Sequence, residues 1–154
     1  MKIRVLDIAY ETMADGPGLR TSIYCAGCAH CCPGCHNPQS WDFKGGQEMS
    51  VQELLDIIKD DEFANVTFSG GDPLYQVEAF TELARRIKEE TGKTIWCYTG
   101  FTYEEILADD RLSQILPYLD ALVEGPFVLE LRDTELPFRG SSNQRIIYMD
   151  GRDS

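Results

Sequence analysis

The chain has 154 residues, of which 43% are hydrophobic and 26% charged, and its formal net charge is −12. This composition is ordinary for a soluble globular protein, and the length predicts a single domain over residues 1–154. The acidic balance argues against binding to nucleic acids or anionic membranes, because neutralising phosphates requires clustered Lys and Arg.

The amino-terminal sequence shows no basic region followed by an apolar stretch, so it predicts no signal peptide. No apolar run approaches the ~20 residues that a membrane-spanning helix needs. We therefore expect a cytoplasmic protein. In that reducing compartment, clustered cysteines indicate metal ligands or redox groups rather than a disulfide framework.

Predicted strands and helices alternate along the chain. Ser50 is a good helix N-cap, with Glu53 at the capping-box position, and Gly92 is a stop signal for a second helix. In chain order the pattern predicts a strand at 2–10, a strand at 19–24, a helix from Ser50 to about Lys59, a strand at 65–69, a helix at 76–91, a strand at 93–98, short helical pieces at 103–108 and 112–118, and a strand at 120–124. Apolar runs follow at 127–131 and 145–149, with a polar loop at 139–144 between them.

This alternation, with turn residues at the strand ends, predicts an α/β fold with a mostly parallel sheet. A complete eight-unit barrel takes roughly 200 residues or more. The chain is shorter than that, so we expect a compact partial (β/α) barrel with one open side.

Five of the six cysteines fall between residues 25 and 35. Thiolates at such spacing bind iron–sulfur clusters or zinc. Cys28, Cys32 and Cys35 would hold three irons of a [4Fe-4S] cluster and leave the fourth iron open to bind a small molecule.

Two other ligand sets are compatible with the same segment. A closed, ferredoxin-like cluster for electron transfer would use Cys25, Cys28, Cys31 and Cys35. A zinc site would use Cys28, Cys32, Cys35 and His36, although the adjacent residues Cys35 and His36 make awkward co-ligands.

A second motif, Ser69-Gly70-Gly71-Asp72-Pro73, follows a predicted strand. Paired glycines let the backbone approach a ligand closely, and Asp72 supplies a carboxylate. Alone, such a sequence is most often a turn. Downstream of an open-cluster cysteine triple, it predicts a ligand-binding loop.

The chain resembles the radical S-adenosylmethionine enzymes, and within them the activating proteins of glycyl-radical enzymes. The resemblance is closest to the members that act on anaerobic ribonucleoside-triphosphate reductase. It is carried by Asp15-Gly-Pro-Gly-Leu-Arg20, Cys28-x3-Cys32-Pro-Gly-Cys35, His36-Asn-Pro38 with Trp41, Ser69-Gly-Gly-Asp-Pro-Leu74, Tyr98-Thr-Gly100, Gly125-Pro-Phe127 and Arg139-Gly-Ser-Ser-Asn-Gln144.

This resemblance implies a partial barrel of the radical S-adenosylmethionine type, with a [4Fe-4S] cluster on Cys28, Cys32 and Cys35. It implies that S-adenosylmethionine binds the open iron. Its remaining contacts are implied to come from Gly34, Cys35, His36, Gly70, Gly71 and Asp72. One electron would break a carbon–sulfur bond of the cofactor, and the 5′-deoxyadenosyl radical would take a hydrogen from a glycine of the partner. No catalytic acid or base is required.

The implied partner is the glycyl-radical subunit of anaerobic ribonucleoside-triphosphate reductase, in an assembly of two subunits of each protein. The implied electron source is a one-electron donor such as flavodoxin. Activation of another glycyl-radical enzyme, of the pyruvate formate-lyase type, is the alternative within the superfamily. A ferredoxin-like electron carrier is the alternative from a different class.

Overall fold

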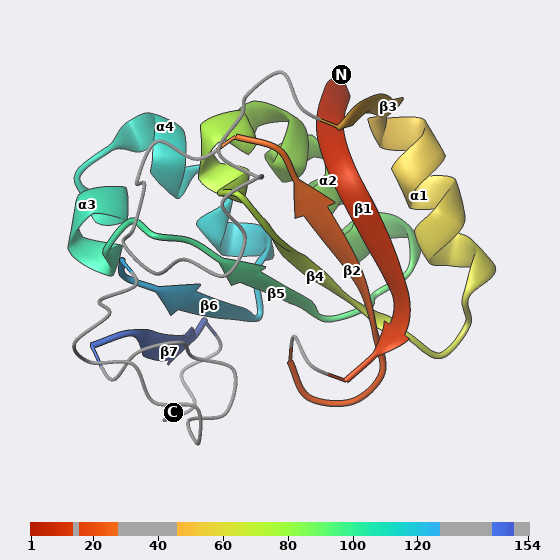
Figure 1. Cartoon of the computed structure of the whole chain (residues 1–154). Coiled ribbons are helices and arrows are strands. Elements are labelled where there is room, and N and C mark those ends of the chain that lie inside the picture. Colours follow the sequence, from red (N-terminus) through yellow and green to blue (C-terminus); the bar gives the residue numbers. More distant parts are fainter. Residues whose placement is uncertain (14–15, 28–45, 127–142, 150–154) are drawn as a thin grey trace.

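The computed structural model describes residues 1–13, 16–27, 46–126 and 143–149. Over these residues the chain forms a seven-stranded sheet with the strand order β3-β1-β2-β4-β5-β6-β7 (Figure 1). The strands are Lys2–Thr12 (β1), Arg20–Cys25 (β2), Gln47–Ser50 (β3), Asn65–Gly70 (β4), Ile95–Tyr98 (β5), Ala121–Glu124 (β6) and Arg145–Tyr148 (β7). The predicted strands are confirmed to within a few residues. The sequence did not predict β3 as a strand, and it gave the region of β7 only as an apolar run at 145–149.

The predicted mostly parallel partial barrel is wrong, because the sheet is mixed. Strands β2, β4, β5 and β6 run parallel to one another. By contrast, β1 is antiparallel to both β2 and β3, and β7 is antiparallel to β6. Parallel neighbours need a crossover of about a dozen residues or more. The connection between β1 and β2 is shorter than that and contains no helix, so these strands pair as a hairpin.

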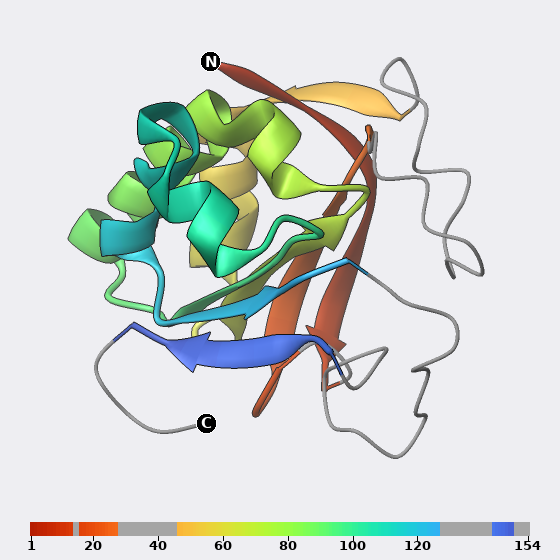
Figure 2. The ribbon, with the colours of Figure 1, turned by 90° about the vertical axis from the view of Figure 1, so that its left-hand side faces the viewer.

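The described residues form four α-helices, fewer than one for every strand. They are Val51–Asp60 (α1), Val77–Glu90 (α2), Tyr103–Leu107 (α3) and Asp110–Ser113 (α4), with short 3-10 helices at Pro73–Gln76 and Leu116–Tyr118. All four α-helices lie on the same face of the sheet (Figure 2). The predicted capping box of the first helix is confirmed, since the Ser50 hydroxyl accepts from the Glu53 amide and the Glu53 carboxylate accepts from the Ser50 amide.

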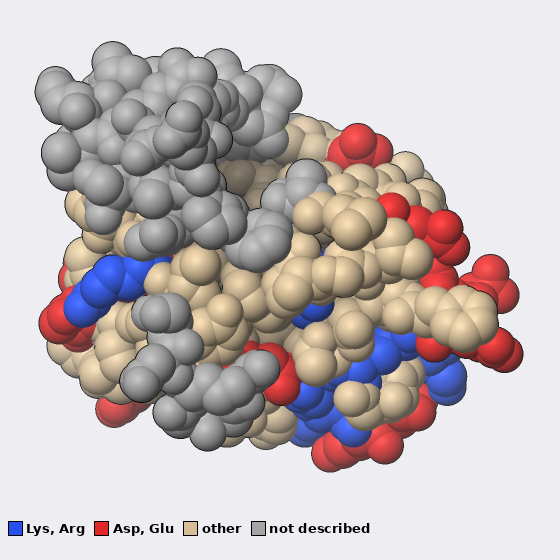
Figure 3. Space-filling model, turned by 90° about the horizontal axis from the view of Figure 1, so that it is seen from below, with Lys and Arg blue, Asp and Glu red and all other residues tan. Residues whose placement is uncertain are grey.

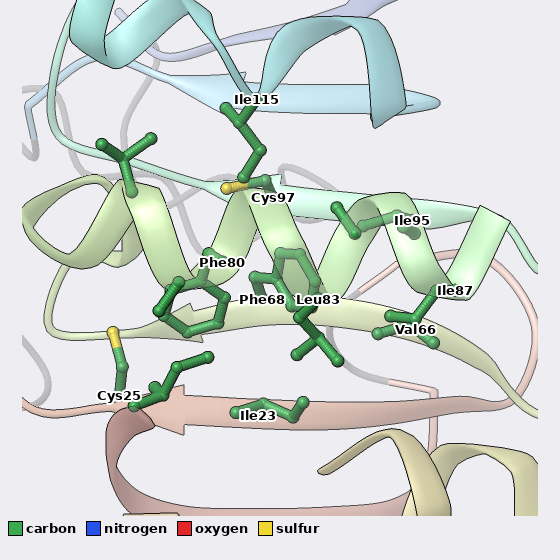
Figure 4. Packing of buried hydrophobic residues seen from close by; sticks show 14 of the residues in the cluster. Ile23, Cys25, Val66, Phe68, Phe80, Leu83, Ile87, Ile95, Cys97 and Ile115 are labelled. Carbon is green, nitrogen blue, oxygen red and sulfur yellow. The ribbon is translucent and has the colours of Figure 1, made fainter. Parts of the chain in front are cut away.

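The hydrophobic core lies between this face of the sheet and helices α1 and α2 (Figure 4). On α2, Phe80, Leu83 and Ile87 are fully buried, which is the apolar face that the helical spacing predicts. The ring of Phe80 packs against that of Phe68 in β4, with ring centroids 4.8 Å apart. Burying each such side chain contributes about 1.5–3 kcal/mol, so this layer supplies much of the stability.

The helix-free face of the sheet carries a smaller aromatic cluster. Trp96, Ala121 and Val123 are buried there, and Trp96 contacts Tyr148 edge to face with ring centroids 5.8 Å apart. Successive residues of a strand point to opposite faces, so Trp96 lies on this face while Cys97 lies in the helix-covered core.

Acidic and basic side chains are interspersed on the face shown in Figure 3, around a middle with few charged residues among those described. Ion pairs between neighbouring turns of α2, such as Arg86–Glu90 at 2.9 Å, illustrate the same mixture. Among the described residues, no helix combines the length and apolarity needed to cross a membrane.

Candidate functional site

The four parallel strands end at one edge of the sheet, and the loops that follow them meet there. Ligand sites of open α/β sheets lie outside the carboxyl ends of the strands, so this edge is the place to look for one. The loops are 25–27 after β2, 70–72 after β4, 99–100 after β5 and 125–126 after β6.

Of the predicted site residues, Gly70, Gly71 and Asp72 lie at this edge, at the end of β4. The predicted cluster ligands and the cofactor contacts near them lie outside the described residues; these are Cys28, Cys32, Gly34, Cys35 and His36. The structure describes the residues on either side of that segment, which end at residue 27 and resume at residue 46. The contacts made with these two flanks show where the Gly70–Asp72 loop lies relative to the segment.

The Gly70–Asp72 loop is bonded directly to the start of the cysteine segment. The Gly71 amide donates to the Cys25 carbonyl at 2.8 Å, and the Asp72 amide donates to the Gly27 carbonyl at 2.8 Å. Gly70 has a φ of +106°, and a Cβ atom on it would lie 2.3 Å from the Cys25 nitrogen. Glycine is thus required at position 70 because two backbones touch there.

The Asp72 carboxylate is completely buried and holds two loops together. One oxygen accepts from the Leu74 amide at 3.0 Å, which caps the 3-10 helix Pro73–Gln76. The other accepts from the Gly100 amide at 2.9 Å, and the Thr99 hydroxyl lies 2.9 Å from both oxygens. Thr99 and Gly100 belong to the motif Tyr98-Thr-Gly100, but the sequence did not predict that they bond to Asp72.

Gln76 and Arg4 together link both flanks of the cysteine segment to β1. Its amide nitrogen donates to the Ala26 carbonyl at 3.0 Å, and its amide oxygen accepts from the Arg4 amide at 2.9 Å. The guanidinium of Arg4 donates to the Gly46 carbonyl at 3.1 Å. The segment between residues 27 and 46 therefore starts and ends at neighbouring points. Sequence reasoning missed Gln76, because its partners are far from it along the chain.

The chain is similar to known proteins over most of its length. A family model described as "4Fe-4S single cluster domain" matches residues 14–147. Relatives named "Anaerobic ribonucleoside-triphosphate reductase-activating protein" are 37% identical in Haemophilus influenzae, where the match covers 86% of this chain and 89% of that protein, and 39% identical in Pasteurella multocida, covering 88% and 90%. A relative of the same name from Enterobacteria phage T4 is 33% identical, covering 86% and 85%.

The chain belongs to the family of anaerobic ribonucleoside-triphosphate reductase-activating proteins.

Two cysteines of this activating-protein family member lie in the hydrophobic core. Cys25 and Cys97 are both fully buried among apolar side chains beneath α2 (Figure 4). Burial raises the pKa of the Cys97 thiol, and the nearby Asp72 charge adds to this effect. Cys97 thus packs as a small apolar residue of the core. Cys25 is one of the ligands of the alternative, ferredoxin-like set, and its side chain is buried in this core.

The loop after β6 is tied to the start of β7. The side-chain amides of Asn143 and Gln144 donate to the carbonyls of Pro126 at 2.8 Å and Gly125 at 2.9 Å. Beside them, Arg145 donates to the buried Glu124 carboxylate at 2.5 Å. Hydrogen bonds to Glu124 and Glu104 raise the pKa of Arg145. The structure thus brings together the described residues of two motifs that carry the resemblance, the one at Gly125-Pro126 and the one that ends at Asn143-Gln144.

The Gly16–Arg20 motif lies at the opposite edge, where the parallel strands begin. The guanidinium of Arg20 donates to Thr67 Oγ1 at 2.9 Å and to the Pro17 carbonyl at 2.9 Å, and stacks 5.7 Å from the centre of the Trp96 ring. A Cβ atom on Gly16 would lie 2.8 Å from the Arg20 side chain. In this family member the motif is therefore a structural anchor for the first loop.

An open hollow of about 600 Å³ lies near that same edge. Its lining is acidic and aromatic, and consists of Tyr10, Glu11, Ile57, Asp60, Asp61, Glu62 and Phe63. Hydrogen bonds from the amides of Ala64 and Phe63 lower the pKa of Asp61. The carboxylate therefore stabilises the turn before β4. This hollow is separate from the loops that follow the parallel strands.

Proposed function

We propose that this protein is a radical S-adenosylmethionine activating enzyme, an oxidoreductase that generates a glycyl radical on anaerobic ribonucleoside-triphosphate reductase. Support comes from its family, whose members are named for activating that reductase, and from the 4Fe-4S family match. The observation that carries the proposal is the pair of bonds from Gly71 and Asp72 to the carbonyls of Cys25 and Gly27. They hold a glycine-rich loop against the residue that precedes Cys28.

A cofactor at this edge of the sheet is supported by the close backbone approach at Gly70, where a Cβ atom would lie 2.3 Å from the Cys25 nitrogen. In the proposal, Cys28, Cys32 and Cys35 hold three irons of a [4Fe-4S] cluster, and the fourth iron is left for S-adenosylmethionine. When bound, the cluster and S-adenosylmethionine supply one-electron cleavage of a carbon–sulfur bond, giving methionine and a 5′-deoxyadenosyl radical that takes a glycine hydrogen.

The protein's own residues orient the cofactor. The Gly70–Gly71–Asp72 loop holds the methionyl amine, for which backbone carbonyls are suitable acceptors. Gly34, Cys35 and His36 contact the cofactor beside the cluster. No proton has to be moved by a side chain of this chain, so the proposal assigns no catalytic acid or base.

The partners follow from the same proposal. The substrate is the glycyl-radical subunit of the reductase, in an assembly of two copies of each protein, and the electron comes from a donor such as flavodoxin. We also propose a cytoplasmic location, because thiolate ligands are maintained in a reducing compartment.

The test is to mix the reconstituted protein with S-adenosylmethionine, a reductant and the reductase under anaerobic conditions. Electron paramagnetic resonance should then detect a glycyl radical on the reductase, together with stoichiometric 5′-deoxyadenosine. A radical on pyruvate formate-lyase and none on the reductase would assign the alternative partner instead.

Matched cysteine variants test the ligand set in the same assay. Cys32→Ala should lose the cluster and the cleavage of S-adenosylmethionine, whereas Cys31→Ala should keep both. Loss of the cluster in Cys31→Ala but not in Cys32→Ala, with no cleavage of S-adenosylmethionine by the parent protein, would identify the ferredoxin-like set, and the proposed chemistry would then be wrong.

A further inference from the structure

Asp72 joins three separate segments of the carboxyl edge. Its amide donates to the Gly27 carbonyl at 2.8 Å, in the segment that leads to Cys28. Its carboxylate binds its own loop through the Leu74 amide, and the loop after β5 through Thr99 and Gly100. The side chain has no exposed surface.

Three donor groups already surround the carboxylate, namely the Leu74 amide, the Gly100 amide and the Thr99 hydroxyl. An ionised carboxylate offers about four lone-pair sites, two on each oxygen. Oδ1 lies within hydrogen-bond distance of the Leu74 amide and the Thr99 hydroxyl, and Oδ2 within that of the Gly100 amide and the same hydroxyl. Because the side chain is fully buried, an ammonium group could reach the carboxylate only by opening this contact between two loops.

We propose that Asp72 is a positioning residue, which acts on the cofactor through the backbone of three loops instead of binding the methionyl amine with its carboxylate. The inference rests on the proposed function and refines the role of one residue within it. The amine is then held by backbone carbonyls of Gly70 and Gly71. The Asp72–Thr99 contact sets where those carbonyls and the Gly27 carbonyl lie.

Thr99 makes it possible to distinguish a positioning role of Asp72 from direct binding of the amine. It bonds to Asp72 but is not itself a predicted cofactor contact. Thr99→Val keeps the shape of the side chain and removes the hydroxyl, while Asp72→Asn removes the negative charge and one acceptor oxygen. If Asp72 acts through the loops, both variants disturb the same element. Their effects are then not additive, as expected for residues in one network.

Three measurements on the full-length, cluster-loaded protein test the inference. The first is the electron paramagnetic resonance spectrum of the reduced cluster before S-adenosylmethionine is added, which should change in both variants. The second is amide hydrogen exchange of residues 26–27 and 99–101, which should be faster in both. The third is the KM for S-adenosylmethionine, which should rise about tenfold in each single variant and no further in the double variant.

Thr99→Ser restores the hydroxyl and should return all three readouts toward those of the parent protein. Thr102→Val is the matched control: it removes a hydroxyl from the same loop, where Thr102 caps α3 and does not contact Asp72. It should lower stability slightly and leave the cluster spectrum unchanged.

A direct amine contact predicts a different result. The KM would then rise in Asp72→Asn alone, the spectrum before addition of S-adenosylmethionine would not change, and Thr99→Val would behave as the parent protein; that result overturns the inference. If Asp72→Asn does not fold, comparing Thr99→Val with Thr99→Ser still tests the inference, because only loss of the hydroxyl should change the cluster spectrum and the exchange rates. If the parent protein does not cleave S-adenosylmethionine, the proposed function fails, yet the spectra and the exchange rates still show whether Asp72 and Thr99 act together.

Discussion

Arg20 allows a quantitative prediction, because the structure gives both what its burial costs and what its bonds return. The guanidinium is 1% exposed and donates to Thr67 Oγ1, the Pro17 carbonyl, the Val66 carbonyl and Thr94 Oγ1. Four bonds at about 1 kcal/mol each contribute about 4 kcal/mol. Desolvation lowers the pKa of Arg20 to about 10, which corresponds to a cost of about 3 kcal/mol for keeping the charged form.

Three substitutions separate these effects. Arg20→Met loses the hydrogen bonds but also the cost of burying a charge, and it keeps most of the packing on Trp96. The free energy of unfolding should therefore fall by only about 1 kcal/mol. Arg20→Lys keeps a buried cation but loses the planar fork, and should lose about 2 kcal/mol. Arg20→Ala also leaves a cavity beside Trp96, and should lose about 4 kcal/mol.

The assay is urea unfolding of the cluster-loaded protein under anaerobic conditions, with thermal unfolding as a second probe. For a chain of this size, about 4 kcal/mol lowers the Tm by about 8–16 °C. The predicted order of stability is Met above Lys above Ala. If the Lys variant is more stable than the Met variant, or if Met is as damaging as Ala, the balance between burial and bonding drawn here is wrong.

Two further predictions concern the carboxyl edge and the core. Gly70→Ala should lower both stability and iron content, because the added Cβ would lie 2.3 Å from the neighbouring strand's backbone. The control Gly92→Ala is also at positive φ but has no atom within 4 Å, so it should lower stability alone. Equal iron loss in both variants would refute the reasoning. Burial raises the pKa of Cys97, so its thiol should resist iodoacetamide at pH 8 in the native protein and react once urea unfolds it, as followed by peptide mass spectrometry; rapid labelling of the native protein would show that this part of the core is open.

Features that depend on neighbouring residues were predicted from the sequence. The start of α1 is one example, because its capping box is formed by side chains and amides only three residues apart. The apolar face of α2 is another, because helical periodicity alone selects its buried residues. The Gly70–Asp72 loop was also predicted to follow a strand, since paired glycines and a proline end β4.

Features that depend on contacts between distant residues required the tertiary structure. The residues Gln47–Ser50 have no strand pattern of their own and form β3 by pairing with β1, from Lys2↔Ser50 to Val5↔Gln47. The mostly parallel sheet was predicted incorrectly for the same reason, since alternation along the chain does not reveal which neighbours a strand pairs with.

The candidate site divides in the same way. The residue types and spacings indicated thiolate ligands and a glycine-rich loop, because that chemistry is written in short segments of sequence. The sequence did not indicate that Cys25 is buried in the core, or that the carboxylate of Asp72 is bonded to Thr99 and Gly100. Those facts depend on which strands lie side by side, and the energy of pairing and packing across the whole sheet decides that.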